Sequence, residues 1–385
     1  MSPSASFLRD RGAFLLVLAF AFAVPRLEAQ SVDAAGIRAN AIALEQRGDN
    51  DKAEQAWQAL AKADPRNAEA LAHLGLLEAR QERLEKAIGF YRQAIAIDPD
   101  LPGLQMNLGL ALFKAAQFPG AIQMFASEIK KHPGDQRLTI LLGMSHFGLR
   151  DYFVAIPYLR RAADRDPQNL TLRMALARSC LMSKQYQCVI DVHREIEAVN
   201  QNVAEADVLA AEALDAQQDH EGAVSQLRAA IQANAEEANV HFALGYLLWT
   251  KGQWAEAARE LEAELQHYPQ NIQARIFLAD AQVQQGDFAT PLADLKKLVA
   301  RNPSEPLVHI DLGTIAARNG HTEDALRELR IAAQGASENS EVHMRIAEQF
   351  ESMERTEEAQ LERERAGGIP QRGYASLLDV LESSD

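Results

Sequence analysis

The sequence predicts an all-α fold: a right-handed superhelical solenoid of about ten antiparallel helix–turn–helix units. A 34-residue period runs without insertion or deletion through ten units, which start at residues 34, 68, 102, 136, 170, 204, 238, 272, 306 and 340. Small residues recur at positions 8 and 20 of the unit, and proline recurs at position 32. Position 8 is glycine or alanine in every unit: Ala41, Gly75, Gly109, Gly143, Ala177, Ala211, Gly245, Ala279, Gly313 and Ala347. Because each unit of such an array packs only on its neighbours, residues 30–366 are expected to form one elongated body.

The recurring residue types define the two helices of each unit. Antiparallel helices that pack at close range need small side chains where they touch, and positions 8 and 20 supply them. Large apolar residues at positions 7 and 24 fill the remaining space, as Leu108 and Phe125 do in unit 3. Proline at position 32, such as Pro133, cannot continue a helix and therefore ends the second one.

The repeat resembles that of the tetratricopeptide repeat family, whose 34-residue unit carries Leu-Gly, Ala-x-x-x-Phe and a terminal Pro. Unit 3 is close to this pattern: Leu108-Gly109-x-x-Leu112, Ala121-x-x-x-Phe125 and Pro133. The resemblance covers residues 34 to about 366 and implies stacked helical hairpins. Unit 5 departs most, with Val189, His193 and Ile196 where the family usually has Ala, Phe and Ala.

Residues 1–29 have the features of a cleavable export signal. Two arginines precede an apolar run over residues 13–24, which is too short to span a bilayer. Cleavage is expected after Ala29, with cleavage after Ala23 as the alternative, and an uncleaved N-terminal anchor is the competing interpretation. The sequence therefore predicts an exported bacterial protein, periplasmic or secreted, with no stable membrane insertion.

Residues 367–385 follow the last unit and differ from it in character. The run Gly367-Gly368-Ile369-Pro370 is typical of a helix stop and a joint. The apolar residues of the short segment that follows are Leu377, Leu378, Val380 and Leu381. This segment is expected to cap the exposed face of the last unit, because terminal repeats need a cover. A tail that another molecule recognises is the alternative.

The only two cysteines, Cys180 and Cys188, both lie in unit 5. They occupy positions 11 and 19, near the turn that joins the two helices of the hairpin. Antiparallel helices bring such positions to a similar height, so a disulfide can form in an oxidising compartment. A pair of buried free thiols is the equal alternative.

The sequence holds no recognisable catalytic motif. No Gly-rich phosphate loop, nucleophile elbow or His-Glu-x-x-His pair occurs, so no catalytic residue, cofactor or metal site is predicted. His241, His309 and His343 share position 4, where a packing role is expected. Glu128 and Glu264 stand at position 27, where a small residue is usual, and each must reach solvent or find a hydrogen-bond donor.

The resemblance implies that the first helices line a concave groove, into which positions 2, 5, 9, 12 and 13 point. In this chain those positions are mostly apolar, rather than the Lys and Asn with which some family members grip a terminal carboxylate. The candidate partner-binding residues are Leu76, Met106, Leu110, Phe113, Ile140, Met144, Phe147, Met174, Leu181, Met182, Phe242, Tyr246 and Trp249. Exposure in the groove is favoured for the aromatic members, against the alternative that they belong to the core. Acidic residues of units 6 and 8, including Asp280, are expected to separate two apolar stations.

These features predict a non-catalytic scaffold or adaptor that binds an apolar or amphipathic segment of another protein. A role in the assembly of the cell envelope is expected, and the oligomeric state is left open. The formal net charge of −15 disfavours nucleic acid and anionic membranes as partners. The alternatives are a regulatory or substrate-recruiting subunit of an enzyme complex and, less favoured, a hydrolase within the array.

Overall fold

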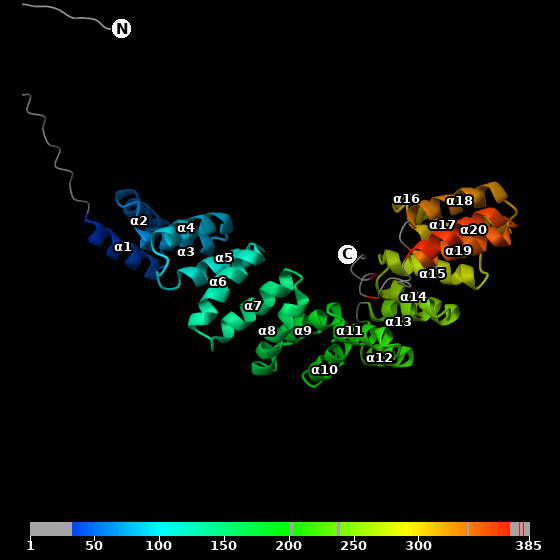
Figure 1. The fold of residues 1–385 in the computed structure, drawn as a ribbon, viewed down its shortest axis with the longest axis horizontal. Helices are drawn as coiled ribbons and strands as arrows, with labels where there is room; N and C mark the ends of the chain where they lie inside the picture. Colours follow the sequence, from blue (N-terminus) through cyan, green and yellow to red (C-terminus); the bar gives the residue numbers. More distant parts are fainter. Residues whose placement is uncertain are drawn as a thin grey trace, which may run out of the picture.

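The computed structural model describes residues 33–200, 203–236, 239–336 and 339–369, together with Leu377 and Val380. The described part is entirely helical and contains twenty α-helices and no strand (Figure 1). The helices alternate in the predicted register, so each 34-residue unit is one antiparallel hairpin. The expected export signal over residues 1–29 lies outside the described residues.

The first helix of each unit begins at or near position 1. These helices are α1 (Ala34–Gln46), α3 (Ala68–Arg80), α5 (Leu104–Lys114), α7 (Gln136–Gly148), α9 (Leu170–Met182), α11 (Ala204–Ala216), α13 (Val240–Thr250), α15 (Ile272–Gln284), α17 (Pro306–Arg318) and α19 (Ser340–Ser352). The second helices are α2 (Asn50–Ala63), α4 (Leu84–Ile97), α6 (Phe118–Lys131), α8 (Tyr152–Arg165), α10 (Tyr186–Glu197), α12 (His220–Ala233), α14 (Trp254–His267), α16 (Leu292–Arg301), α18 (Thr322–Gly335) and α20 (Thr356–Gly368).

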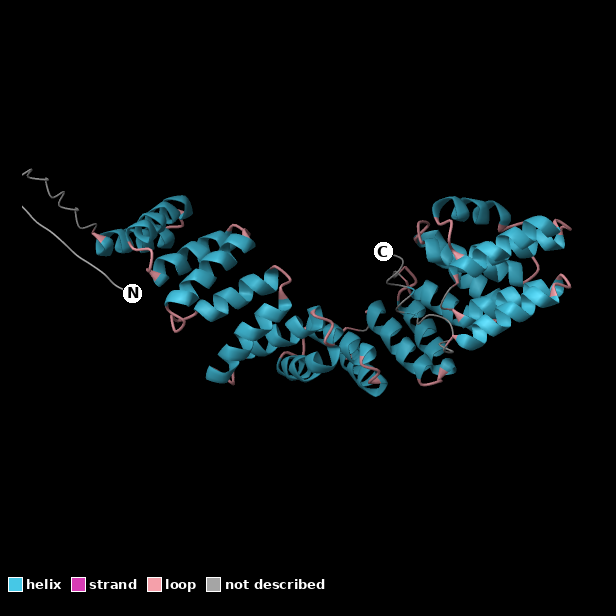
Figure 2. Ribbon diagram, turned by 45° about the horizontal axis from the view of Figure 1, so that its top comes forward, coloured by secondary structure: helices cyan, strands magenta, loops and turns pink. Residues whose placement is uncertain are grey.

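The hairpins stack into an open arch, with α1 and α20 towards its two ends (Figures 1 and 2). Each second helix packs on the first helix of the next unit. First helices of neighbouring units also contact one another, as α7 and α9 or α15 and α17 do. First helices of neighbouring units contact one another more closely than second helices do. The first helices therefore lie on the inner side of the curve and form the inner face of the arch.

Within each hairpin, position 8 packs directly against position 24. A Cβ atom added to Gly109 would lie 2.5 Å from Cε1 of Phe125, and one added to Gly75 would lie 2.7 Å from the ring of Tyr91. Both rings are completely or almost completely buried, at 0% and 1% exposed. The glycines therefore allow an aromatic side chain to fill the space between the helices, as the sequence predicted.

We expect Gly109→Ala to lower the free energy of unfolding by about 1–2 kcal/mol, because overpacking a buried contact outweighs the roughly 1 kcal/mol that alanine gains over glycine in a helix. Gly89→Ala is the matched control, since Gly89 is also inside a helix but an added Cβ meets nothing within 4 Å. That variant should be stabilised by up to about 1 kcal/mol. Urea unfolding followed by circular dichroism measures both, and equal effects of the two substitutions would contradict this packing argument.

The turn between the two helices has one conformation in all ten units. Position 15 has a positive φ in every unit, whether it is glycine, as in Gly48, or not, as in Arg150. The following N–H group donates back to a carbonyl of the first helix, for example Asp49 N–H to Leu44 O at 3.0 Å. This is the Schellman closure of a helix end, which requires a left-handed residue. The constant turn geometry explains why the period tolerates no insertion.

Unit 8 departs from this regularity at its second helix. The other second helices start at position 17, whereas α16 starts at Leu292, after Pro291. The carboxylate of Asp287 accepts hydrogen bonds from the N–H groups of Ala289 and Thr290, both at 3.1 Å, and so stabilises a non-helical turn. The side-chain hydroxyl of Thr290, followed by the N–H groups of Thr290 and Ala289, holds the pKa of Asp287 below its usual range.

The C-terminal segment was expected to cap the last unit, and its two described residues do not do so. Leu377 and Val380 are 1% and 7% exposed and belong to the hydrophobic cluster built by units 6–9. The core of the last unit is a separate cluster that contains neither residue. Leu378 and Leu381 lie outside the described residues. For Leu377 and Val380, therefore, the capping prediction is wrong, because an apolar surface further back in the array covers them.

Candidate functional site

The inner face of units 2–5 carries a set of partly accessible apolar side chains, here named the open face. Its residues come from α3, α5, α7 and α9: Leu76, Met106, Leu110, Phe113, Ile140, Met144, Phe147, Met174 and Met182. Leu110 and Met182 are 37% and 43% exposed, and the others are half-buried. Leu181 is buried at 7% exposure, so its predicted exposure is wrong: at this position the side chain packs into the core of units 4–6.

Aromatic rings of the open face are held by the start of the second helix in the same unit. Phe113 meets the ring of Phe118 edge-on, with centroids 5.8 Å apart. Phe147 meets Tyr152 in the same way and at the same 5.8 Å, one unit further on. Phe118 and Tyr152 are the first residues of α6 and α8. The repeat thus places two similarly oriented rings side by side on the inner face, each half-buried and pre-positioned.

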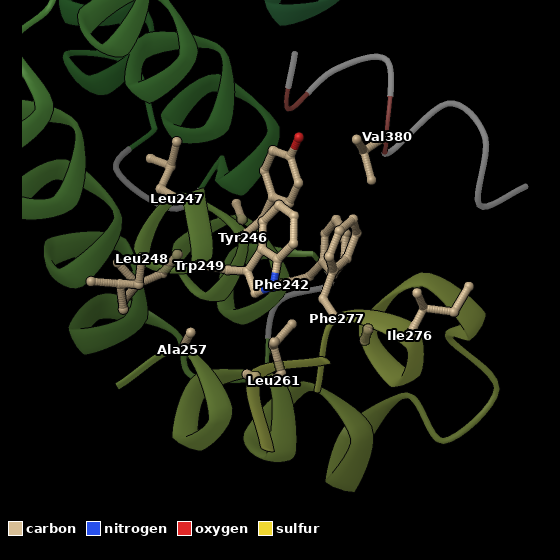
Figure 3. Close-up of a cluster of buried hydrophobic side chains, with 14 of the residues drawn as sticks. Phe242, Tyr246, Leu247, Leu248, Trp249, Ala257, Leu261, Ile276, Phe277 and Val380 are labelled. Carbon is tan, nitrogen blue, oxygen red and sulfur yellow. The ribbon is translucent and has the colours of Figure 1, made fainter. Parts of the chain in front are cut away.

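The aromatic stripe of unit 7 is not exposed. Phe242, Tyr246 and Trp249 are 0%, 2% and 1% exposed, so the prediction that they face an open groove is wrong. The ring of Phe277 on α15 covers them, at centroid distances of 6.1, 5.0 and 4.8 Å. We call Phe242, Tyr246, Trp249 and Phe277 the aromatic cluster. Val380 belongs to the same hydrophobic cluster, and Figure 3 shows it at the edge of the group of aromatic rings.

A buried charged network lies beside the aromatic cluster. The indole N–H of Trp249 donates to Oδ2 of Asp280 at 2.5 Å, and the guanidinium of Arg345 donates to Oδ1 of the same carboxylate. A second carboxyl group, that of Asp311, lies 4.0 Å from Arg345. Asp280 and Asp311 are both fully buried and Arg345 is 9% exposed. Asp280 is therefore not the surface acid that the sequence led us to expect.

The two carboxyl groups differ in their ionisation. Burial opposes the charge of Asp280, but the positive charge of Arg345 and the hydrogen bonds from Arg345 and Trp249 outweigh it and hold its pKa below the usual range. Burial, and then the negative charge of Asp280, raise the pKa of Asp311 well above its usual range. One cation thus balances one carboxylate, and Asp311 is at its most stable when protonated.

The histidines at position 4 form polar contacts between the two helices of their own hairpins. In units 7, 9 and 10 the Nδ1 atom of His241, His309 and His343 lies 2.8, 2.8 and 2.6 Å from a glutamate oxygen at position 23. In unit 8 the same two positions hold Arg275 and Asp294, which are 3.9 Å apart. A nitrogen-bearing side chain on the first helix and a carboxylate on the second therefore recur through four units, and these polar contacts give the three histidines a structural role.

Unit 5 replaces the usual apolar contact with a polar one. Nε2 of His193 lies 2.8 Å from Oδ1 of Asp207 in unit 6, and the side-chain amide of Gln226 donates to the same oxygen at 2.8 Å. Nδ1 of His193 lies 3.6 Å from Glu197. In the described part of the chain, His193, Glu197 and Asp207 are the single set of three side chains close enough to share a metal ion. The hydrogen bond between His193 and Asp207 accounts for the histidine where the family usually has phenylalanine.

The two glutamates at position 27 find different partners. Glu264 is 1% exposed and accepts hydrogen bonds from the N–H of Phe242 and the amide of Asn271, both at 3.2 Å. It therefore satisfies an N–H group in the first turn of α13, although burial raises its pKa. Glu128 pairs with Lys131 at 3.0 Å near the surface.

Cys180 and Cys188 are joined in a disulfide, which links α9 to α10 across the hairpin turn. Of the two alternatives that the sequence left open, the structure contains the bonded one. The Cα atoms are 5.9 Å apart and the cysteines are separated by eight positions in the sequence. The bond therefore ties together the two helices of the unit with the poorest match to the repeat pattern.

We expect reduction of this disulfide to lower the free energy of unfolding of unit 5 by about 2–3 kcal/mol, the value for a loop of this length when the cross-link limits the unfolded chain. Hydrogen exchange of α9 and α10, with and without dithiothreitol, measures the effect. Cys188→Ala is the control, because its exchange should not respond to the reductant. Identical exchange of the oxidised and reduced wild-type chains would contradict the expectation.

None of the described helices has the length and apolar character that a membrane crossing needs.

The fold and the open face together define a helical repeat protein with an apolar inner surface. The tetratricopeptide repeat family model matches residues 38–102, 106–169, 140–187 and 208–275, and a second tetratricopeptide repeat model matches residues 248–309. The chain belongs to the tetratricopeptide repeat family. The matched ranges leave out residues 188–207, which contain most of the irregular helix α10.

Solved structures with the same architecture include MamA from residue 41 onward, of Desulfovibrio magneticus RS-1, at 18% identity and a TM-score of 0.39. That likeness covers 44% of this chain and 95% of MamA. YrrB, described as a TPR protein with an unusual peptide-binding site, is 18% identical with a TM-score of 0.41, over 47% of this chain and 94% of its own. Yeast Tom70 is 10% identical with a TM-score of 0.39, over 91% and 94%. Similarity at this level concerns the helical repeat architecture alone.

Proposed function

We propose that this chain is a non-catalytic scaffold that binds an apolar or amphipathic segment of a partner protein along the open face of units 2–5. One observation carries the proposal: apolar side chains recur at the inward positions of four successive first helices, and they are partly accessible. Soluble proteins rarely leave such a surface without a partner.

The chemistry of the open face suits a helical or extended apolar ligand. Four of its nine side chains are methionines (Met106, Met144, Met174 and Met182), and two are phenylalanines. Thioethers adapt to irregular shapes, and rings held in place lose little conformational freedom on binding. The partner is therefore expected to present several apolar residues on one side, and burial of that side supplies most of the affinity.

The proposal extends to the cellular location. A signal-like N-terminal segment and a disulfide both support export into an oxidising compartment, where the protein would act in cell-envelope assembly. The net charge of −15 supports a protein partner rather than nucleic acid or an anionic membrane.

The test compares two double variants that change the same kind of exposed apolar residue. Leu110→Glu with Met182→Glu places charges on the open face, whereas Phe153→Glu with Leu361→Glu places them on second helices, at residues 71% and 47% exposed. Cross-linking of the wild-type chain in the envelope fraction, followed by mass spectrometry, identifies the captured partner and the peptide of it that contacts this chain. Fluorescence anisotropy then measures the affinity of that contact peptide for the wild-type chain and for each variant.

We expect the open-face variant to bind the contact peptide at least about tenfold more weakly than wild type, which corresponds to the loss of one or two buried apolar contacts. The second-helix variant should bind as wild type does. Equal affinities of the two variants, with unchanged melting curves, would remove the open face from the binding reaction.

A further inference from the structure

The inner face of units 6–8 already holds an occupant, and it comes from the same chain. Leu377 and Val380 are both helical and almost fully buried in the hydrophobic cluster that contains the aromatic cluster. Residues three apart in a helix share one side, so the two side chains form a single apolar contact. Val380 lies at the edge of the aromatic rings of this cluster (Figure 3).

A polar contact fixes the position of this occupant. The backbone N–H of Leu377 donates to Oε2 of Glu212 at 2.9 Å, across 165 positions of sequence. Glu212 is at position 9 of unit 6, on α11, and Tyr246 is at position 9 of unit 7, on α13. Both therefore occupy the repeat position that points into the groove. A carboxylate that captures a backbone N–H, beside an apolar floor that receives two side chains, is the arrangement of a peptide-binding site.

The occupant does not belong to the repeat. Every other buried apolar residue of this cluster lies at a regular position of units 6–9, whereas Leu377 and Val380 lie beyond the end of α20 at Gly368. The repeats make their own core without it, because Phe277 already packs on Phe242, Tyr246 and Trp249 at ring-contact distances. The segment is attached covalently, so its effective concentration at the site is high even if its intrinsic affinity is modest.

We propose that the inner face of units 6–8 is a second peptide-binding site, and that Leu377 and Val380 belong to its internal ligand. The ligand class is an amphipathic helix that presents two apolar side chains three residues apart and directs a backbone N–H to Glu212. A partner segment of this chemistry binds there only when it displaces the chain's own. This site shares no residue with the open face, so the two proposals succeed or fail separately.

The test weakens the binding of the chain's own segment in a full-length variant, here called the vacated chain, and then adds the segment as a separate peptide. Leu377→Ser with Val380→Ser removes the two apolar contacts without touching any repeat. A fluorescent synthetic peptide of residues 371–385 is titrated into this variant and into the wild-type chain. The control peptide carries the same two serines. Circular dichroism and the melting curve of the variant are recorded alongside.

We expect the wild-type peptide to bind the vacated chain at least about tenfold more tightly than it binds the wild-type chain, because the tethered segment competes for the site in the wild-type chain. It should also bind the vacated chain about tenfold more tightly than the control peptide does. Adding Glu212→Ala to the vacated chain should weaken binding, whereas Glu205→Ala, an exposed neighbour on α11 that pairs with Arg178, should not. Adding the open-face substitutions Leu110→Glu and Met182→Glu should also leave the affinity unchanged.

Three results would overturn the proposal. If the vacated chain loses helix or melts at a markedly lower temperature, Leu377 and Val380 are structural core. If that chain stays folded but binds both peptides alike, the site does not recognise the two apolar side chains. If the wild-type and vacated chains bind the peptide equally, binding occurs elsewhere.

Discussion

Replacing Phe242 by alanine is expected to lower the free energy of unfolding by about 3–5 kcal/mol, the usual loss for a buried phenylalanine. The side chain is 0% exposed and its ring packs against Tyr246 at 6.2 Å and Phe277 at 6.1 Å. Removing the ring of Phe242 leaves a cavity between α13 and α15, and the neighbouring rings cannot fill it without losing their own contacts. Because a solenoid loses stability locally, the effect should concentrate in units 6–9.

The matched control is Phe153→Ala, the same truncation at a residue that is 71% exposed on α8. This change should alter stability by no more than about 0.5 kcal/mol. Urea unfolding gives the free energies, and hydrogen exchange shows which helices open first. If the two truncations had equal effects, Phe242 would not be a core residue and the exposure expected from the sequence would be restored.

The repeat pattern predicts contacts inside a hairpin far better than contacts between distant units. Gly109 and Phe125 belong to one unit, and their spacing recurs in ten registers, so periodicity alone indicates that they touch. The burial of Tyr246 depends instead on its contact with Phe277, which belongs to the next unit. A repeat position predicts the direction in which a side chain points, but it does not predict whether another element covers that side chain. This is why the open face of units 2–5 was predicted with one error and the stripe of unit 7 was mistaken.

The buried network of Asp280, Asp311 and Arg345 had no signal in the sequence that we could use. Asp280 and Arg345 are 65 positions apart, two units along the stack, and the repeat pattern concerns nearest neighbours only. Their contact requires α15 and α19 to approach around the inner side of α17, which depends on the curvature of the array. A charge at an inner-face position was interpreted as a surface feature, although its partner lies on another unit.

Arg345→Met is expected to lower the free energy of unfolding by about 3–5 kcal/mol near neutral pH, because it leaves buried carboxyl groups without their cation. The methionine keeps most of the side-chain volume, so the loss measures charge rather than packing. Arg363→Met is the matched control in the same unit. Arg363 pairs with Glu351 in an exposed ion pair, with side chains 36% and 57% accessible, and its loss should cost no more than about 1 kcal/mol.

The pH dependence of the Arg345→Met deficit separates charge from packing. In the wild-type chain the pKa of Asp280 is lowered, so its contribution is present above the unfolded-state pKa and is lost as the pH falls through the folded-state pKa. The pKa of Asp311 is raised, so its contribution is present at low pH and is lost as the pH rises through the folded-state pKa. Without Arg345 we expect the pKa of Asp280 to be raised as well, so that both carboxyl groups lose their contribution to stability as the pH rises.

The deficit of the variant should therefore be smallest below the lowered folded-state pKa of Asp280, and it should grow as the pH rises through that pKa and then through the raised pKa values of the carboxyl groups in the variant. Adding Asp280→Asn to Arg345→Met removes the stranded charge and should recover part of the stability at the higher pH, because an amide can still accept the hydrogen bond from Trp249. Unfolding free energies across this pH range test the argument. A deficit that is independent of pH would mean that Arg345 stabilises the fold through packing, and that the two buried carboxyl groups are already neutral in the native chain.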